Sequence, residues 1–255
     1  MDDVLFCTLT NNGYSNYTLN CLASLKRIGL KDKLHVYCCD QESYNTIKKD
    51  HENTHLFNQD ILTDEENKNM AIFGSDTFGE VMKLKLMVVH HCLKKSKYVL
   101  FTDGDIVYFK EGFIEYLVDN IGDNNILIQN DKTEGAVSMG DKKPVCCAGF
   151  MFIKQNDETL KIYDMNTEDP LYRNYLDTSK RSGHFDDQIY LRRIRNSHQE
   201  RVKMKLLPSA LFPTYFVYRH RVKLNPPDQK YLLHYNYLTS SDKKKTMVGR
   251  GNWYI

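Results

Sequence analysis

Long apolar runs, an excess of one charge and the common nucleotide-loop motifs are all missing from this sequence of 255 residues. No apolar run reaches the roughly 18 residues that a membrane-spanning helix needs. Lys and Arg total 35 against 33 Asp and Glu, so the net charge of +2 does not predict nucleic-acid binding. Neither G-x-G-x-x-G nor G-x-x-x-x-G-K-[ST] occurs, which argues against Rossmann dehydrogenases and P-loop NTPases.

The seven cysteines include no C-x-x-C pair, which argues against a structural zinc site. Their odd number and the neighbouring pairs at 38–39 and 146–147 do not suggest a disulfide framework. Most lie in apolar runs, where free cysteine packs as a small hydrophobe. We therefore expect a reducing compartment.

Apolar runs alternate with helical periodicity along most of the chain, which predicts one α/β domain with a mixed, mostly parallel sheet flanked by helices. We expect no internal repeat or linker, and divide the domain only loosely into halves at 1–109 and 110–255. The expected strands are 4–9, 34–39, 55–57, 98–101, 106–109, 126–128, 145–153, 202–207 and 231–237. The expected helices are 14–28, 41–50, 78–93, 112–118, 158–165, 171–176 and 185–195. The tail after 238 is basic and glycine-punctuated, and we expect it to be a loop.

The stretch KYVLFTDGDIVYF, residues 97–109, is the centre of the functional prediction. A strand buried on both faces ends at Asp103-Gly104-Asp105, and open α/β sheets bind ligands at the carboxyl ends of such strands. Two carboxylates this close repel unless a positive charge is near. Mg²⁺ or Mn²⁺ would supply that charge, whereas the alternative is an ordinary polar turn.

Several later residues are candidates for the same site, each with an ordinary structural alternative. His234 lies in the apolar run YLLHYNY and could be a third metal ligand or a core histidine bonded to a backbone carbonyl. Lys243 and Lys244 could neutralise a diphosphate or belong to a solvated charge run. Asp186, Asp187 and Gln188 could do acid–base work or cap a helix.

Two segments in the first half could contact a nucleotide. The loop with Thr8, Thr10, Asn11 and Gly13 follows the first strand, where α/β folds often contact nucleotides. Lys83 and Lys85 lie on nearly opposite sides of one predicted helix, so at most one of them would reach a ligand there.

Taken together, these motifs resemble the GT-A-type nucleotide-diphospho-sugar transferases. The resemblance is strongest to the plant cell-wall arabinosyl- and xylosyltransferase group and weaker to glycogenin-like enzymes. It covers most of the chain, and rests on these segments: TLTNNGY, YVLFTDGDIVYF, IQND, CCAGFMFI, FDDQIYLRRI, LLPSALFP and LLHYNYLTSSDKKKTMVGRGNW.

The resemblance implies a role for each matched residue. Asp103, Asp105 and His234 would hold Mn²⁺, or Mg²⁺, against the diphosphate of a donor that is expected to be a UDP-sugar. Asp187, Gln188 and Asp186 would lie near the reacting carbon and the acceptor. The donor itself would be contacted by a longer set: Thr8, Thr10, Asn11, Tyr14, Asp40, Lys83, Asp103, Gly104, Asn130, Asp131, Ala148, Gly149, Lys243 and Lys244.

The expected function is therefore a metal-dependent glycosyltransferase with retention of configuration and a glycan or protein-linked acceptor. The alternatives are a nucleotidyltransferase that makes nucleotide-sugars and a non-catalytic binding protein on the same fold. The start MDDVLFCTL is acidic and has no long apolar core, so we expect a cytoplasmic protein of bacterial, protist or viral origin.

Overall fold

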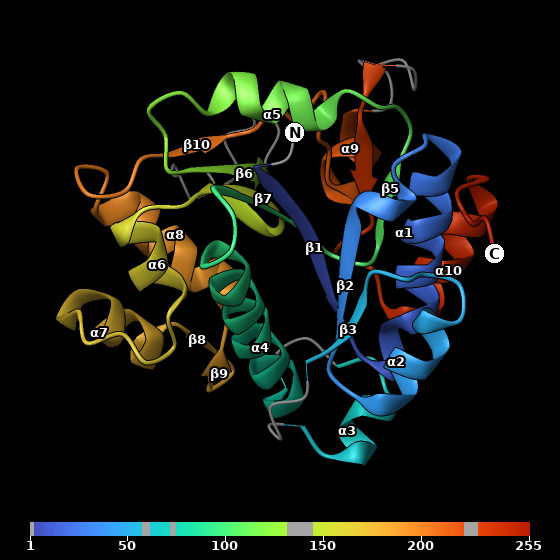
Figure 1. Ribbon diagram of the computed structural model, residues 1–255, viewed down its shortest axis with the longest axis horizontal. Coiled ribbons are helices and arrows are strands. Elements are labelled where there is room, and N and C mark those ends of the chain that lie inside the picture. Colours follow the sequence, from blue (N-terminus) through green and yellow to red (C-terminus); the bar gives the residue numbers. More distant parts are fainter. Residues whose placement is uncertain (1–2, 58–61, 72–74, 132–144, 222–228) are drawn as a thin grey trace.

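Seven strands from both halves of the chain form one twisted sheet in the computed structural model, which describes residues 3–57, 62–71, 75–131, 145–221 and 229–255 (Figure 1). The strand order is β10-β6-β7-β4-β1-β2-β3. The strands are β1 Val4–Thr10, β2 Leu34–Cys38, β3 Thr54–Leu56, β4 Tyr98–Thr102, β6 Ile126–Asn130, β7 Cys146–Lys154 and β10 Met204–Leu206. Four neighbouring pairs are parallel, and the two pairs that β7 makes with β4 and β6 are antiparallel. The predicted mixed, mostly parallel sheet is confirmed.

The strand β7 changes its register against β6 around Ala148 and Gly149. Ile128 of β6 pairs with Met151, but the next residue, Gln129, pairs with Cys147. The residues in between continue the ladder with β4, where Thr102 pairs with Phe150. The irregularity therefore lies directly beside the carboxyl end of β4.

Helices cover both faces of the sheet (Figure 1). One face packs against α4, α6 and α8, and the other packs against α1 and α5. The helices are α1 Ser15–Arg27, α2 Gln41–Lys48, α3 Asp64–Lys68, α4 Asp76–Leu93, α5 Phe113–Ile121, α6 Asp157–Tyr163, α7 Pro170–Thr178, α8 Asp187–Ser197, α9 Tyr215–Arg221 and α10 Ser240–Gly249. Two 3-10 turns, η1 Asn12–Tyr14 and η2 Lys31–Lys33, precede α1 and β2.

Each face of the sheet has its own apolar core, and successive side chains of β4 point alternately into the two cores. Val99 and Phe101 pack with α4 and α8, whereas Leu100 packs with α1 and α5. All three are 1% exposed or less. A strand apolar on both faces can only sit inside a covered sheet, and β4 lies between β7 and β1.

A smaller sheet stands beside the carboxyl end of β4. It pairs β5 Ile106–Tyr108 with β11 Leu232–His234 in antiparallel orientation. A third core, of Tyr17, Val107, Leu233, Tyr235 and Met247, joins these strands to α1 and α10. A separate hairpin of β8 Lys180–Arg181 and β9 His184–Phe185 precedes α8.

Two predictions about secondary structure were wrong, and the helices α3 and α9 and the β8–β9 hairpin were not predicted. The expected strand 231–237 is only three residues long, because Tyr235 and the residues after it leave the ladder to enclose the site. The tail expected to be a loop contains the helix α10, whose buried Met247 holds it to the third core. The helix α3, five residues long, was too short and too polar for its pattern to indicate it.

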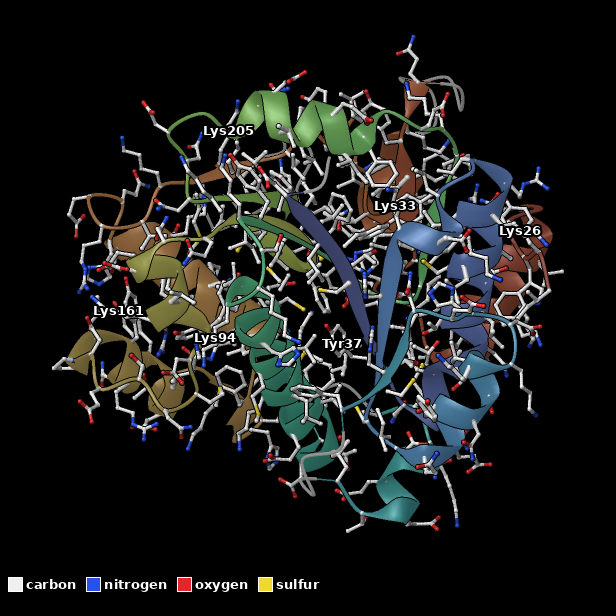
Figure 2. All side chains as sticks on the ribbon, in the orientation of Figure 1. Lys26, Lys33, Tyr37, Lys94, Lys161 and Lys205 are labelled. Carbon is white, nitrogen blue, oxygen red and sulfur yellow. The ribbon has the colours of Figure 1, made fainter. Side chains whose placement is uncertain are left out.

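Charged side chains are spread over the surface rather than gathered on one face. Figure 2 shows Lys26, Lys33, Lys94, Lys161 and Lys205 around the periphery, whereas Tyr37 lies inside, between the sheet and α4. All seven cysteines are buried and free. Among the described residues, no helix has both the length and the hydropathy that a membrane span requires.

Candidate active site

The turn between β4 and β5 carries Asp103, Gly104 and Asp105, and backbone hydrogen bonds fix it on both sides. The Asp103 amide donates to the Gly149 carbonyl of β7 at 2.7 Å. The Asp105 carbonyl accepts from the Tyr235 amide, just after β11, at 3.1 Å. Two segments far apart in the sequence, β7 and the residues after β11, therefore hold this turn in place.

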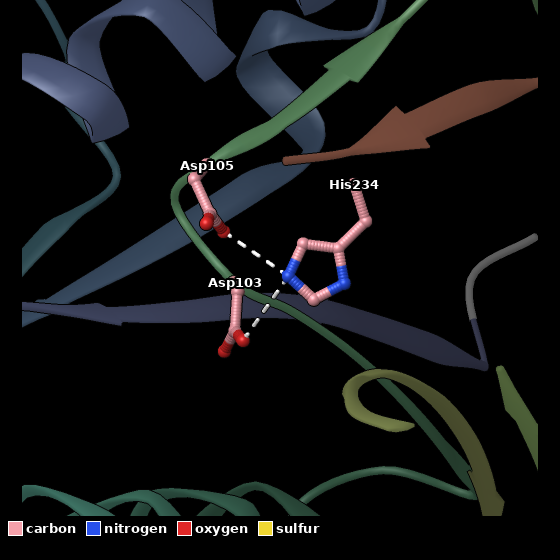
Figure 3. Close-up of side chains that lie close together, drawn as sticks. All are labelled: Asp103, Asp105 and His234. Carbon is pink, nitrogen blue, oxygen red and sulfur yellow. Dashed lines mark ion pairs between the residues drawn. The ribbon is translucent and has the colours of Figure 1, made fainter. Parts of the chain in front are cut away.

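His234, the last residue of β11, faces both carboxylates of the turn (Figure 3). Its Nε2 lies 3.2 Å from Oδ1 of Asp105 and 3.7 Å from Oδ2 of Asp103. Asp105 and His234 are each 2% exposed, so the cluster lies at the bottom of the site. One nitrogen and two carboxylate oxygens thus converge on one point, which an isolated polar turn would not produce.

The outer oxygens of the same two carboxylates are each paired with a lysine. Lys85 Nζ of α4 lies 3.2 Å from Oδ1 of Asp103, and Lys243 Nζ of α10 lies 2.6 Å from Oδ2 of Asp105. Both lysines are almost fully buried. The inner oxygens remain for His234, and Oδ1 of Asp105 has no hydrogen-bond donor.

Burial and these neighbours shift the pKa values of the two aspartates in opposite directions. Burial raises the pKa of Asp103, and Lys85 and His234 offset only part of that rise. Burial alone would also raise the pKa of Asp105, but Lys243 and His234 outweigh it and hold that pKa well below its usual value. Asp105 is therefore ionised at neutral pH.

A divalent cation fits the donor set of Asp103, Asp105 and His234. Their ligand atoms lie within 4.8 Å of one another. A six-coordinate ion with bonds of about 2.1 Å needs adjacent ligand atoms about 3 Å apart, close to the 3.2 Å between Asp105 and His234. The buried Oδ1 of Asp105, which lacks a donor, is the atom that most needs a cation.

Two glycines make this close approach possible. A Cβ on Gly149 would lie 2.1 Å from Cε1 of His234 and 2.6 Å from Oδ2 of Asp103. A Cβ on Gly104 would lie 2.5 Å from Oγ1 of Thr18 on α1. Gly149, and Ala148 beside it, therefore form the wall of the cluster on the β7 side.

A glutamine absent from the sequence prediction orients His234. Oε1 of Gln129, on β6, lies 2.8 Å from Nδ1 of His234, and its Nε2 donates to the Phe212 carbonyl at 3.0 Å. The second bond fixes the amide orientation, so Oε1 must accept the proton on Nδ1. In the neutral imidazole, Nε2 of His234 is then a lone pair that faces the carboxylates. Gln129 belongs to the segment IQND, which was the signal in the sequence, but only the fold shows which of its residues points toward His234.

The structure distinguishes the three predicted catalytic residues at the start of α8. Asp186 is buried, accepts from the Ile189 amide at 2.8 Å and pairs with Arg181 at 2.9 Å, so its role is to cap the helix. Asp187 is buried and lies 2.9 Å from Lys85 Nζ. Gln188 is partly exposed and contacts the Tyr237 hydroxyl.

The loop after β1 reaches the cluster through Tyr14. Its hydroxyl accepts from Lys243 Nζ at 2.8 Å, and burial together with Asp105 raises the pKa of this tyrosine. Thr10 accepts from Thr18 at 2.9 Å, and the buried Thr8 hydroxyl has no hydrogen-bond partner. These residues lie at the end of β1 and in the loop after it, which the sequence predicted to contact the nucleotide.

Two other residues predicted to contact the donor, Asn11 and Asp40, cap helices. Asn11 caps η1 by accepting from the Tyr14 amide at 3.1 Å. Asp40 caps α2, and its carboxylate also accepts from the Asn12 amide at 2.9 Å. The oxygens of Asp40 are thus already engaged, which does not favour the predicted contact with a base or ribose.

Each predicted pair of lysines has one member beside the carboxylates. Lys85 contacts Asp103 and Asp187, whereas Lys83, predicted to contact the donor, is about one-third exposed, pairs with Glu80 at 2.7 Å and lines a separate hollow of about 460 Å³. The two are about 200° apart on α4, so only one could turn inward. On α10, Lys243 enters the site, whereas Lys244 is exposed and stacks over Trp253 at 4.9 Å.

Beyond His234, the chain folds over the end of β6. Asn236 Nδ2 donates to Oδ1 of Asp131 at 3.1 Å, and the Tyr237 hydroxyl donates to Oδ2 of the same residue. Asn130 and Asp131 are both buried here. Tyr237 was not predicted as a site residue, because nothing in YLLHYNY distinguishes its tyrosines.

The α/β fold with a mixed sheet, and a carboxylate pair at the carboxyl end of a central strand, define a glycosyltransferase of the GT-A class. The comparison with protein families agrees: the model of the family described as nucleotide-diphospho-sugar transferase matches residues 29–247. The chain belongs to that family.

Relatives and solved structures support the same assignment. UDP-galactose:fucoside alpha-3-galactosyltransferase of Dictyostelium discoideum is 26% identical over 99% of this chain, which spans 43% of that protein. Mouse xyloside xylosyltransferase 1 shares the fold with a TM-score of 0.57 at 15% identity, covering 92% of this chain and 98% of the other. The galactosyltransferase LgtC gives 0.57 at 12% identity, covering 98% and 96%.

Proposed function

We propose that this protein transfers a hexose from a UDP-sugar to a glycan acceptor and that Asp103, Asp105 and His234 hold a Mn²⁺ or Mg²⁺ ion for the reaction. The observation that carries the proposal is the donor set itself. Two carboxylates turn their inner oxygens toward a bare imidazole nitrogen, while lysines pair their outer oxygens. An arrangement built only for stability would pair the inner oxygens as well.

UDP-galactose is the first donor to test. The Dictyostelium relative and LgtC are both named as galactosyltransferases, which supports galactose over other sugars. The relative's name also gives a fucoside as its acceptor, so fucosides are the first acceptors to test.

The chain's own side chains have distinct roles in this proposal. Lys243, held 2.6 Å from Asp105, is placed to neutralise the diphosphate as the sugar leaves, and a bound cation would add to that charge stabilisation. Lys85 keeps Asp103 and Asp187 together at the other side. Asn130 and Asp131 would contact the donor sugar.

Gln188 is our candidate for the residue beside the reacting carbon. Asp187 is tied to Lys85 and Asp186 caps α8, so neither carboxylate is free to act as a nucleophile. Of the three predicted catalytic residues, only Gln188 is partly exposed, and its side chain contacts the Tyr237 hydroxyl. We propose retention of configuration, as the family resemblance suggests.

Calorimetric titration with UDP tests the proposal. Wild-type protein should bind UDP only when Mn²⁺ is present, and Asp105→Asn should weaken that binding at least about 100-fold, because it removes the ionised ligand. Asp123→Asn makes the same charge change at an exposed site and should bind as wild type does. Equal UDP affinity in wild type and Asp105→Asn would overturn the proposed metal site.

A further inference from the structure

Tyr237 has a backbone conformation that tyrosine rarely adopts. Its φ is +59°, and Ser182, at +53°, is the other non-glycine residue with positive φ among those that the structure describes. Glycine or asparagine would occupy such a position at lower cost. Strain of this kind persists only where surrounding contacts enforce it, and it is common at ligand-binding sites.

The contacts that hold Tyr237 all lead to the proposed sugar pocket. Its hydroxyl donates to the buried carboxylate of Asp131 and contacts Gln188. Its neighbour Asn236 donates to the other oxygen of Asp131 at 3.1 Å. The metal-ligand candidate His234 lies three residues before it. The strained backbone therefore directs this hydroxyl toward the residues proposed to contact the donor sugar.

Although its hydroxyl reaches a buried carboxylate, Tyr237 itself is largely exposed to solvent. The residue is 62% exposed, whereas Asp131, which its hydroxyl contacts, is 4% exposed. Phe216 of α9 is 46% exposed and packs against the same ring, with the centroids 5.9 Å apart. Two large exposed aromatic rings in contact form an apolar patch beside a polar pocket, which is unusual for a surface without a ligand.

We propose that Tyr237 and Phe216 form an aromatic platform that binds the apolar face of the acceptor sugar. A pyranose ring has a face of C–H groups surrounded by hydroxyls, so it matches an aromatic face next to hydrogen-bonding groups. Gln188, which is partly exposed and contacts the Tyr237 hydroxyl, supplies such a group. The inference rests on the proposed function, because the donor would occupy the buried side and leave the exposed side to the acceptor.

Three variants separate the ring, the hydroxyl and the backbone strain. Tyr237→Asn removes the ring at a position where asparagine tolerates positive φ. Tyr237→Phe keeps the ring and removes the bond to Asp131. Ser182→Gly is the matched control, since it relieves positive φ in the exposed β8–β9 hairpin. Thermal melting establishes that each variant is folded.

Saturation-transfer NMR measures binding of four probes, the methyl glycosides of galactose, glucose, fucose and xylose, with Mn²⁺ and UDP present and absent. Wild type should bind at least one of them, and Tyr237→Asn should weaken that binding about 5- to 10-fold. Tyr237→Phe and Ser182→Gly should stay within about threefold of wild type.

Two outcomes would overturn the platform: no binding of any probe by wild type, or equal affinity in wild type and Tyr237→Asn. A calorimetric titration with UDP and Mn²⁺ on the same samples reports on the proposed function. If UDP fails to bind while a glycoside binds through Tyr237, the proposed donor site fails and the sugar platform stands. If UDP binds and no glycoside does, the sugar platform fails and the proposed donor site stands.

Discussion

Two groups of charged side chains in this protein differ in how completely their oxygens are paired. On the outer side of α6 and α7, Arg201 bridges Glu158 at 2.9 Å and Asp169 at 2.8 Å. Tyr172 and Lys161 complete the coordination of Glu158 at 2.7 and 3.1 Å. Each of these carboxylates has its donors within the protein.

The cluster of Asp103, Asp105 and His234 is more deeply buried and less completely paired. Lysines satisfy its outer oxygens, whereas Oδ1 of Asp105 has no donor. Because burial makes an unpaired charge more costly, the buried cluster should be the better satisfied of the two if both served stability alone. This difference supports the proposed metal site.

The largest expected effect is on stability, from Lys85→Met. Lys85 is 3% exposed and pairs with both Asp103 and Asp187, so its removal takes the shared cation from the buried Asp187 and the partly buried Asp103. We expect a loss of about 3–5 kcal/mol in the free energy of unfolding, measured with urea in EDTA.

The neighbouring Lys83→Met is the matched control for that measurement. Its pair with Glu80 is about one-third exposed, so the loss should be below about 0.5 kcal/mol. Equal losses in the two variants would mean that the buried cluster and the surface pairs contribute equally to stability. That result would contradict the expected difference between buried and exposed charged groups.

The next largest effect concerns Gln129, which fixes the proton of His234 on Nδ1. Gln129→Met removes that acceptor, so Mn²⁺ affinity should fall about 10- to 100-fold, as measured by electron paramagnetic resonance of free Mn²⁺. Gln129→Glu keeps an acceptor for Nδ1, loses the bond to Phe212 and adds a carboxylate that still orients the imidazole, so its affinity should stay near that of wild type. If the Met and Glu variants weaken equally, Gln129 acts through packing alone.

The smallest effect is expected in the outer cluster, from Arg201→Met. The hydrogen bond from Arg201 lowers the pKa of Asp169. Burial alone would raise the pKa of Glu158, but hydrogen bonds from Tyr172, Arg201 and Lys161 outweigh it and lower that pKa. Solvent screens these pairs, so the loss at neutral pH should be about 1 kcal/mol.

This loss should depend on pH in one direction. A carboxylate with a lowered folded-state pKa adds stability that is complete above its unfolded pKa of about 4 and disappears as pH falls through the folded value. Urea unfolding measures the free energy of unfolding of wild type and Arg201→Met. The difference between these two free energies should therefore be constant above about pH 5 and shrink below pH 4. A difference that grows with acidity would rule out ion pairing as its origin.

The sequence alone determined the central sheet and the carboxylate pair. The buried strand at 98–101 is apolar on both faces, so its central place and the position of Asp103 and Asp105 at its end followed from the pattern. The helix before it was also predictable, although its register left Lys83 and Lys85 undecided. That choice depends on which side of α4 meets the sheet, and a spacing of two residues cannot decide it.

Only the tertiary structure decided what surrounds the carboxylates. His234, Lys243 and Tyr237 come from a segment more than a hundred residues later, whose tail has too little apolar periodicity to indicate α10. Gln129 meets His234 because the fold brings the carboxyl ends of β6 and β11 together, although they are about a hundred residues apart in the sequence. Local sequence sets which strands are buried, whereas long-range packing sets which polar side chains meet.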